Sequence, residues 1–186
     1  MPTRSQEQLS PASSVQLTAP PLPYVRDGIG YGVLDDIAAA RDLFAFAAAP
    51  CPPKPDVGLA WAAWADSSRL VGTLFAERHG RAALLWGPVV RERTRALDIA
   101  GEVVAVAIGQ TRAAGVDTLF ARPQGLDRIW VRFGFIPVPE GTLPAELRGC
   151  PGAGLFGYRG GSAIWSQDRS AGRYDDHEIR VGRGPL

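Results

Sequence analysis

Apolar and polar residues alternate along this chain in blocks that predict strands and helices in a definite order. Short apolar runs bounded by turn residues are expected to be strands, and they lie at residues 29–34, 58–65, 70–76, 81–90, 118–121, 135–138 and 161–166. Apolar residues spaced three and four positions apart predict helices at residues 37–47, 98–114 and 126–133. The order is β-α-β-β-β-α-β-α-β-β, which predicts an α/β domain whose sheet is part antiparallel and part parallel.

Turn and capping residues support these boundaries. Asp35 or Asp36 can cap the first helix, and the proline-rich residues 50–55 end it. Short turns at 66–69 and 78–80 join three consecutive strands, which are therefore expected to be antiparallel. The long helix lies between two buried strands, so we expect a parallel crossover between them.

Composition indicates one domain with a core of its own. The chain has 186 residues, of which 46% are hydrophobic and 21% charged, as in ordinary globular proteins. Residues 1–22 are rich in Ser, Pro, Gln and Thr, and residues 168–186 are polar. We expect a flexible leader and a flexible tail there, with the domain at residues 23–167.

Charge and cysteine usage narrow the function classes. The net charge of +1 favours neither nucleic acid nor an anionic membrane as a partner. Cys51 and Cys150 fit neither a disulfide framework nor a zinc site, so we expect no metal and a reducing compartment. With no signal-peptide pattern and no membrane-length apolar run, the expected location is the cytoplasm.

Residues 84–101 carry the chemistry that is easiest to interpret. They predict a strand, a short basic loop and the first turn of the long helix. The N-terminus of a helix has N–H groups without partners and a partial positive charge, which suits a phosphate ligand. Asp98, however, lies where a glycine would let the backbone approach such a ligand.

The element order and three local motifs resemble the GNAT (GCN5-related) N-acetyltransferase superfamily. Residues 87–90, Gly-Pro-Val-Val, are similar to the segment that leads into the family's coenzyme A loop. Residues 95–100, Arg-Ala-Leu-Asp-Ile-Ala, resemble a degenerate Arg-Gly-x-Gly-x-Ala loop. Residues 126–135 are similar to the family's late helix, which ends in a Gly-Phe turn. The resemblance spans about residues 24–166.

This resemblance implies a single GNAT-like domain with a central twisted mixed sheet of six to seven strands flanked by helices. It implies acetyl-CoA as the cosubstrate and a small amine or amino acid as the acceptor, with a homodimer as one possible assembly. Main-chain N–H groups near Val89 and Val90 would polarise the thioester carbonyl. The residues implied in coenzyme A binding are Val89, Val90, Arg91, Arg93, Arg95, Ala96, Asp98, Ala100, Gly101 and Trp130.

The chain departs from the family pattern at three of these positions. Ala96 and Asp98 replace the two glycines, and the Asp98 carboxylate can either cap the helix or lie beside a bound pyrophosphate. Arg91, Arg93 and Arg95 can compensate as phosphate donors, or form a solvated basic loop. Trp130 stands where the family usually has a tyrosine that protonates the leaving thiolate, so we expect it to pack in the core.

No residue stands out as the general base or acid. Glu77 and Glu92 are the nearest candidates for the base, and Tyr158 is the nearest substitute for the missing tyrosine. The leading hypothesis is an N-acetyltransferase in which the amine attacks the thioester directly. Two alternatives are a module that has kept the scaffold without catalysis, and an enzyme that uses a thioester on a carrier protein.

Overall fold

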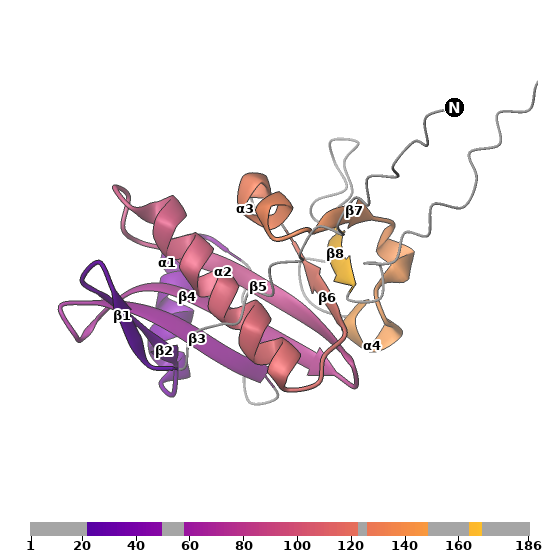
Figure 1. Cartoon of the computed structure of the whole chain (residues 1–186), viewed down its shortest axis with the longest axis horizontal. Coiled ribbons are helices and arrows are strands. Elements are labelled where there is room, and N and C mark those ends of the chain that lie inside the picture. The colour runs from indigo at the N-terminus through magenta and orange to yellow at the C-terminus, as the bar shows by residue number, and fades with distance from the viewer. Residues whose placement is uncertain (1–21, 50–57, 123–125, 149–163, 169–186) are drawn as a thin grey trace, which may run out of the picture.

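A computed structural model describes residues 22–49, 58–122, 126–148 and 164–168 (Figure 1). Its strands are β1 (Tyr24–Arg26), β2 (Ile29–Val33), β3 (Gly58–Ala65), β4 (Arg69–His79), β5 (Ala82–Val90), β6 (Thr118–Ala121), β7 (Ile136–Val138) and β8 (Ile164–Asp168). Its helices are α1 (Ile37–Phe46), α2 (Ala96–Ala113), α3 (Asp127–Arg132), α4 (Ala145–Arg148) and the 3-10 helix η2 (Glu140–Thr142).

The strands form one mixed sheet in the order β1-β2-β3-β4-β5-β6-β8-β7. The pairs along β2, β3, β4 and β5 are antiparallel, and β5 pairs with β6 in parallel through the α2 crossover. The mixed sheet, the three consecutive antiparallel strands and the crossover are thus confirmed. Within the described ranges the sheet has eight strands rather than six to seven, because the short β1 adds a hairpin partner to β2.

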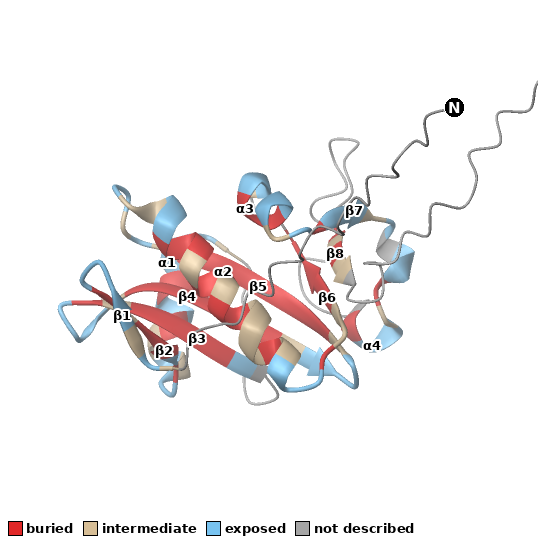
Figure 2. Cartoon of the chain, in the orientation of Figure 1, coloured by how far each residue is buried: buried red, intermediate tan, exposed pale blue. Residues whose placement is uncertain are grey.

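The sheet separates two hydrophobic cores. On one face, α2 packs Ile99, Val103 and Ala107 against sheet residues that include Trp61 and Leu85; we call this the α2 face. On the other face, Leu43 and Phe44 of α1 and Leu147 of α4 pack against Phe75, Leu84 and Trp86; we call this the α1/α4 face. Figure 2 shows the central strands and parts of α2 as buried.

Helix boundaries follow the expected capping with one difference. Asp36 caps α1 by accepting hydrogen bonds from Ala38 N at 3.0 Å and Ala39 N at 3.4 Å. The long helix begins at Ala96 rather than at Asp98, because Ile99 N already donates to Arg95 O at 3.0 Å. Ala96 and Leu97 are good helix formers, so the helix gains a further half turn.

Several expectations concern residues that lie outside the described ranges. They are the leader before residue 22, the tail after residue 168, Cys51, Cys150 and Tyr158. Among the helices of the described residues, none combines the length and the apolar character needed to cross a bilayer.

Candidate active site

The site is built where β5 and β6 stop pairing. The parallel ladder runs from Ala82↔Thr118 to Leu85↔Ala121, and residues 86–90 of β5 continue past the end of β6 without a partner on it. We call this divergence of the two strands the fork. The carboxyl ends of parallel strands are where ligands bind in open α/β sheets.

A β-bulge shapes β5 at the fork. Phe75 pairs with Trp86 and Thr73 with Val89, so Leu74 opposes two residues of β5. Gly87 has a φ of +98°, and a Cβ there would lie 3.1 Å from Val89 N and 3.2 Å from Thr73 O. Both atoms belong to the backbone and cannot move aside easily, so this bulge requires glycine.

The bulge leaves one main-chain N–H directed into the fork. Arg91 N donates to Val71 O at 2.8 Å, and Gly72 pairs with Val90 in the same register. Because hydrogen-bonded and non-bonded pairs alternate in an antiparallel ladder, the N–H of Val90 points away from β4 and towards the fork. The same alternation directs the N–H of Val89 towards Thr73.

The first turn of α2 offers further main-chain donors. The first bond inside the helix is made by Ile99 N, so the N–H groups of residues 95–98 have no partner within it. The N-cap residue Arg95 makes no side-chain cap. Asp98 is exposed and is the third helical residue, so of its two expected roles the N-cap is wrong, because Arg95 occupies that position.

Two other positions of the expected loop face the core instead. Ala100 is 1% exposed and belongs to the α2-face core, and Gly101 is buried as well. Neither residue is among the N–H donors at the start of the helix, since Ala100 packs on the sheet and Gly101, where a Cβ would meet nothing within 4 Å, lies one residue further along.

The three arginines of the loop have different surroundings. The Arg91 guanidinium lies over the exposed ring of Phe46, 4.9 Å from its centroid. Arg93 is exposed. Arg95 Nη1 donates to the carbonyl oxygen of Asp27 at 2.8 Å, and its Nη2 lies 3.7 Å from the Asp27 carboxylate. Arg95 therefore joins the β1–β2 turn to the start of α2.

A second set of contacts joins the same hairpin to α2. The Tyr24 hydroxyl donates to Glu102 Oε2 at 3.0 Å, and Arg26 pairs with the other oxygen of Glu102. The rings of Tyr24 and Tyr31 stack with centroids 5.1 Å apart. Burial raises the pKa of Tyr31 to about 12, and burial and the bond to Glu102 raise the pKa of Tyr24 further.

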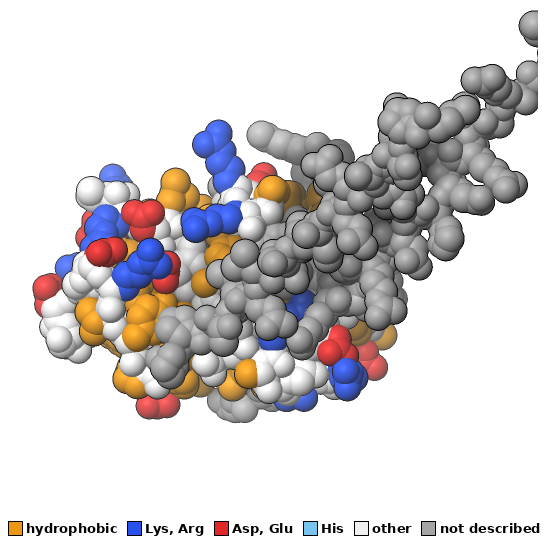
Figure 3. Space-filling model, viewed as in Figure 1, with side chains coloured by type: hydrophobic (Ala, Val, Ile, Leu, Met, Phe, Trp, Pro, Cys, Tyr) orange, Lys and Arg blue, Asp and Glu red, His pale blue; other side chains and the backbone are white. Residues whose placement is uncertain are grey.

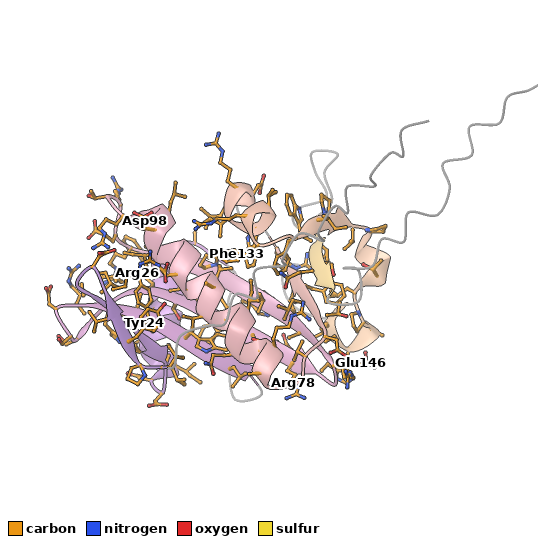
Figure 4. All side chains as sticks on the ribbon, in the orientation of Figure 1. Tyr24, Arg26, Arg78, Asp98, Phe133 and Glu146 are labelled. Atoms are coloured by element: carbon orange, nitrogen blue, oxygen red, sulfur yellow. The ribbon has the colours of Figure 1, made fainter. Side chains whose placement is uncertain are left out.

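Charged side chains of both signs surround this junction. Figure 4 shows Tyr24 and Arg26 on β1 beside α2, with Asp98 at the first turn of that helix. Figure 3 shows acidic and basic side chains intermingled on this part of the surface, so the junction carries no large field of one sign.

The candidate acids and bases are not gathered at the fork. Glu77 pairs with Leu84, within the part of β5 that is still joined to β6. The Glu92 carboxylate accepts from Thr94 N at 3.2 Å and so orders its own loop. Tyr158 lies outside the described residues.

Trp130 is a packing residue, as expected. Its side chain is fully buried, and its ring meets Phe135 edge-on with centroids 4.9 Å apart. Its indole Nε1 has no hydrogen-bond acceptor among the described residues.

Sequence reasoning missed two features of the site. The β1–β2 hairpin was readable, because Asp27-Gly28 is a strong two-residue hairpin signal and both residues have positive φ here, 51° and 77°. Arg122 follows β6 and is 3% exposed. Nothing in its local sequence marks an arginine that will be buried.

Solved structures share this architecture. A putative acyl-CoA N-acyltransferase from Klebsiella pneumoniae subsp. pneumoniae MGH 78578 aligns over 75% of this chain and 97% of its own, with a TM-score of 0.55 and 13% identity. The ribosomal-protein-S18-alanine N-acetyltransferase from Escherichia coli aligns over 75% and 93%, with a TM-score of 0.52 and 13% identity. An acetyltransferase of the GNAT family from Staphylococcus aureus Mu50 aligns over 60% and 67%, with a TM-score of 0.47 and 16% identity.

At the level of sequence, no family model and no curated protein matches this chain. The likeness to the solved structures therefore concerns the arrangement of the backbone. The mixed sheet, the parallel β5–α2–β6 crossover and the alignments with the Klebsiella pneumoniae and Escherichia coli proteins agree: the chain has the fold of the GNAT N-acyltransferases.

Proposed function

We propose that the protein is an acyl-CoA-dependent N-acyltransferase that transfers an acetyl group to a small amine or amino acid. The observation that carries the proposal is the fork, where a main-chain N–H from Val90 and the uncapped first turn of α2 meet in a GNAT fold. Acyl transfer from a thioester requires one group that holds the anionic carrier and another that polarises the carbonyl. The first turn of α2 suits the first task, and the N–H of Val90 suits the second.

The residues at the start of α2 fit the pyrophosphate of coenzyme A. The N–H groups of residues 95–98 and the positive end of the helix dipole would hold it, with Arg91 and Arg93 as further donors. Asp98 opposes this binding because it adds a negative charge to the same turn. Since Asp98 is exposed, water screens that charge, and the expected cost is about 1 kcal/mol.

The N–H of Val90 would stabilise the negative charge that develops on the thioester oxygen when an amine attacks. The amine must also lose a proton, and Glu77 and Glu92 are not placed to take it directly at the fork. Ordered water is then the simplest acceptor of that proton. The indole of Trp130 cannot protonate the leaving thiolate, so that role stays with solvent or with Tyr158.

The first experiment measures binding and transfer separately. Isothermal titration calorimetry with acetyl-CoA tests binding, and release of free thiol in the presence of a panel of amines tests transfer. A chain that binds no coenzyme A would contradict the proposal.

A proline substitution tests the Val90 N–H. Because this N–H points away from β4, Val90→Pro removes it without removing a ladder bond. We expect kcat to fall about 10²-fold, as when one oxyanion donor is lost. Val90→Ala keeps the N–H and is the matched control; an equal loss in both variants would mean that the side chain, not the amide, matters.

A second candidate is a module that has kept the scaffold without catalysis. The acid in the first turn of α2 and the indole in place of a tyrosine favour it. On this reading the native chain binds no coenzyme A, while Asp98→Gly combined with Trp130→Tyr gains binding. Tight binding by the native chain would exclude it.

A further inference from the structure

The start of α2 lacks the side-chain cap that many helices have. Asp36 caps α1, whereas Arg95, the N-cap residue of α2, makes no side-chain cap bond within the described residues. A capping side chain accepts a hydrogen bond from the second or third N–H of its helix, so it occupies a donor that a phosphate would need. Without a cap those donors stay open, but the first turn then frays more readily.

Contacts from the β1–β2 hairpin are placed where they can replace the cap. Arg95 and Glu102 lie seven positions apart, which puts them on the same side of α2. The Arg95 side chain donates to the carbonyl oxygen of Asp27 at 2.8 Å, and Glu102 pairs with Arg26. We call these two contacts, together with the bond from Tyr24 to Glu102, the brace. It holds α2 at its N-cap and again two turns further along.

The charges of the brace fix how α2 lies against the hairpin. Arg26 and Asp27 are adjacent and of opposite sign, and they meet Glu102 and Arg95, which are also of opposite sign. Exchanging the partners would place like charges together, and a shift of α2 by one turn would separate both pairs. The side chain of Glu102 is only 24% exposed, so water and salt screen its pair less than an exposed one.

The hairpin is a firm support for these contacts. Strand β2 pairs with β3 along its whole length, and its Tyr31 is 2% exposed in the same core as Ile99 of α2. The turn residues Asp27 and Gly28 both have positive φ, as in the tight two-residue turns that match the twist of a hairpin. The carbonyl group that receives Arg95 therefore has a defined place beside the start of α2.

We propose that the side chains of Glu102 and Arg95 are positioning residues for the coenzyme site. Through the β1–β2 hairpin they hold the first turn of α2 in the geometry that presents its free N–H groups to a phosphate. The brace thus does the work of a cap without occupying the donors that a cap would use. This inference rests on the proposed function, and it assigns to that function residues that do not touch the reacting atoms.

Removing Glu102 distinguishes positioning from a simple effect of charge. Glu102 lies four residues beyond Asp98, about 6 Å along the helix axis. On charge alone, loss of a carboxylate this close to the first turn favours an anionic ligand, since the Debye length is about 8 Å. Loss of the brace has the opposite effect: only molecules with an ordered first turn bind, so the apparent Kd rises as their fraction falls.

Calorimetry with coenzyme A and NMR hydrogen exchange of the ligand-free chain test Glu102→Ala. We expect coenzyme A to bind about fivefold more weakly, as when the ordered fraction falls to about a fifth. The KM for acetyl-CoA should rise more than kcat falls. The amide of Ile99, which donates to Arg95 O at 3.0 Å, should exchange several-fold faster. The amide of Ala114, bonded at the other end of α2, should not change.

Three further variants serve as controls. Glu146→Ala removes a glutamate that also pairs with a basic side chain, His79, at 3.5 Å. His79 pairs with Ala82, at the opposite end of β5 from the fork, so this variant should leave coenzyme A affinity unchanged. Glu102→Gln keeps an oxygen that can accept from Tyr24 and should recover part of the loss. Tyr24→Phe removes only the hydroxyl and should reproduce part of it, even if Glu102→Ala does not fold.

The outcomes separate the positioning role from the proposed function. A native chain that binds no coenzyme A contradicts the proposed function, and the exchange of Ile99 in the ligand-free chain then decides alone whether the brace holds the first turn. If the native chain binds coenzyme A and Glu102→Ala binds it as tightly or more tightly, the positioning role is overturned and the transferase proposal stands. Unchanged exchange of Ile99 in Glu102→Ala overturns the positioning role as well.

Discussion

At the scale of single residues, Asp98 has two opposite effects on the same turn. Its carboxylate stabilises the positive end of α2, but it also repels an anionic ligand there. We therefore predict that Asp98→Asn binds acetyl-CoA about fivefold more tightly, which corresponds to the ~1 kcal/mol expected for a screened charge pair. Calorimetry measures the affinity.

The same variant should be slightly less stable without ligand, by about 0.3–1 kcal/mol, because a favourable charge at the helix N-terminus is lost. Asp127→Asn is the matched control, since Asp127 is the acid in the first turn of α3. It should lose a similar stability and leave coenzyme A affinity unchanged. An affinity that falls in Asp98→Asn would mean that the carboxylate helps to bind the ligand.

Tyr24 and Tyr31 give the protein a predictable response to alkali. Both pKa values are raised by burial, that of Tyr31 to about 12, whereas an unfolded tyrosine titrates near 10. Folding therefore favours the protonated rings, and the stability they contribute is complete below about pH 10. It is lost as the pH rises from about 10 through the folded pKa values.

We predict that the free energy of unfolding, measured by urea denaturation, falls steadily above about pH 10. Tyr24→Phe removes one of the two groups and should make that fall shallower. The ultraviolet absorbance of tyrosinate in the native chain should show two tyrosines titrating late. If every tyrosine of the native chain titrates near pH 10, these two rings are not buried in solution as they are in this structure.

At the scale of elements, two glycines that look alike in sequence have opposite structural roles. A Cβ on Gly72 of β4 would lie 3.0 Å from Ile99 Cγ2 of α2 and 3.4 Å from Ala63 Cβ. A Cβ on Gly101 of α2 would meet nothing within 4 Å. Gly72 thus lets the first turn of α2 approach the sheet beside Val90, whereas Gly101 only weakens the helix.

We predict that Gly72→Ala destabilises the fold by about 1–3 kcal/mol, because Ile99 must move away from the sheet. Gly101→Ala should stabilise it by about 0.5–1 kcal/mol, because alanine is the better helix former and has room. Urea denaturation measures the free energy of unfolding of both variants, and each variant serves as the control for the other. If Gly101→Ala destabilises the protein, α2 packs more tightly around residue 101 in solution than it does in this structure.

Some of these elements can be predicted from the sequence, whereas others depend on contacts between distant residues. Patterning predicted the sheet, the crossover and α1 with Asp35 or Asp36 as its cap, because these depend on local periodicity and on residues a few positions apart. It missed the partner of Arg95, since Asp27 lies 68 positions away in the sequence. It also misplaced the cap of α2 and left the buried Arg122 unnoticed, because both depend on tertiary contacts that no local pattern records.

At the scale of the whole molecule, the sheet has two arms that separate beyond a short parallel ladder. Strands β1 to β5 form one arm and β6, β8 and β7 the other, and among the described residues the strand pairing between the arms runs from Ala82↔Thr118 to Leu85↔Ala121. The first turn of α2 lies near Val90 of β5, since a Cβ on Gly72 would approach both Val90 and Ile99, and the helix is tied to the outer hairpin through Arg95 and Glu102. A ligand at the fork would therefore contact the ends of both arms and the first turn of α2.

We predict that acetyl-CoA raises the melting temperature by mass action and slows hydrogen exchange at a defined set of amides. Those amides are Val90, which faces the fork, and Ala96 and Leu97, which have no partner within α2. The amides of Ala38 and Ala39 at the start of α1 are already bonded to Asp36 and should not change, so they serve as the internal control. Hydrogen–deuterium exchange with mass spectrometry, with and without ligand, measures both sets. Protection at α1 without protection at Val90 and the start of α2 would place the coenzyme elsewhere, because a ligand held by main-chain donors must shield those donors first.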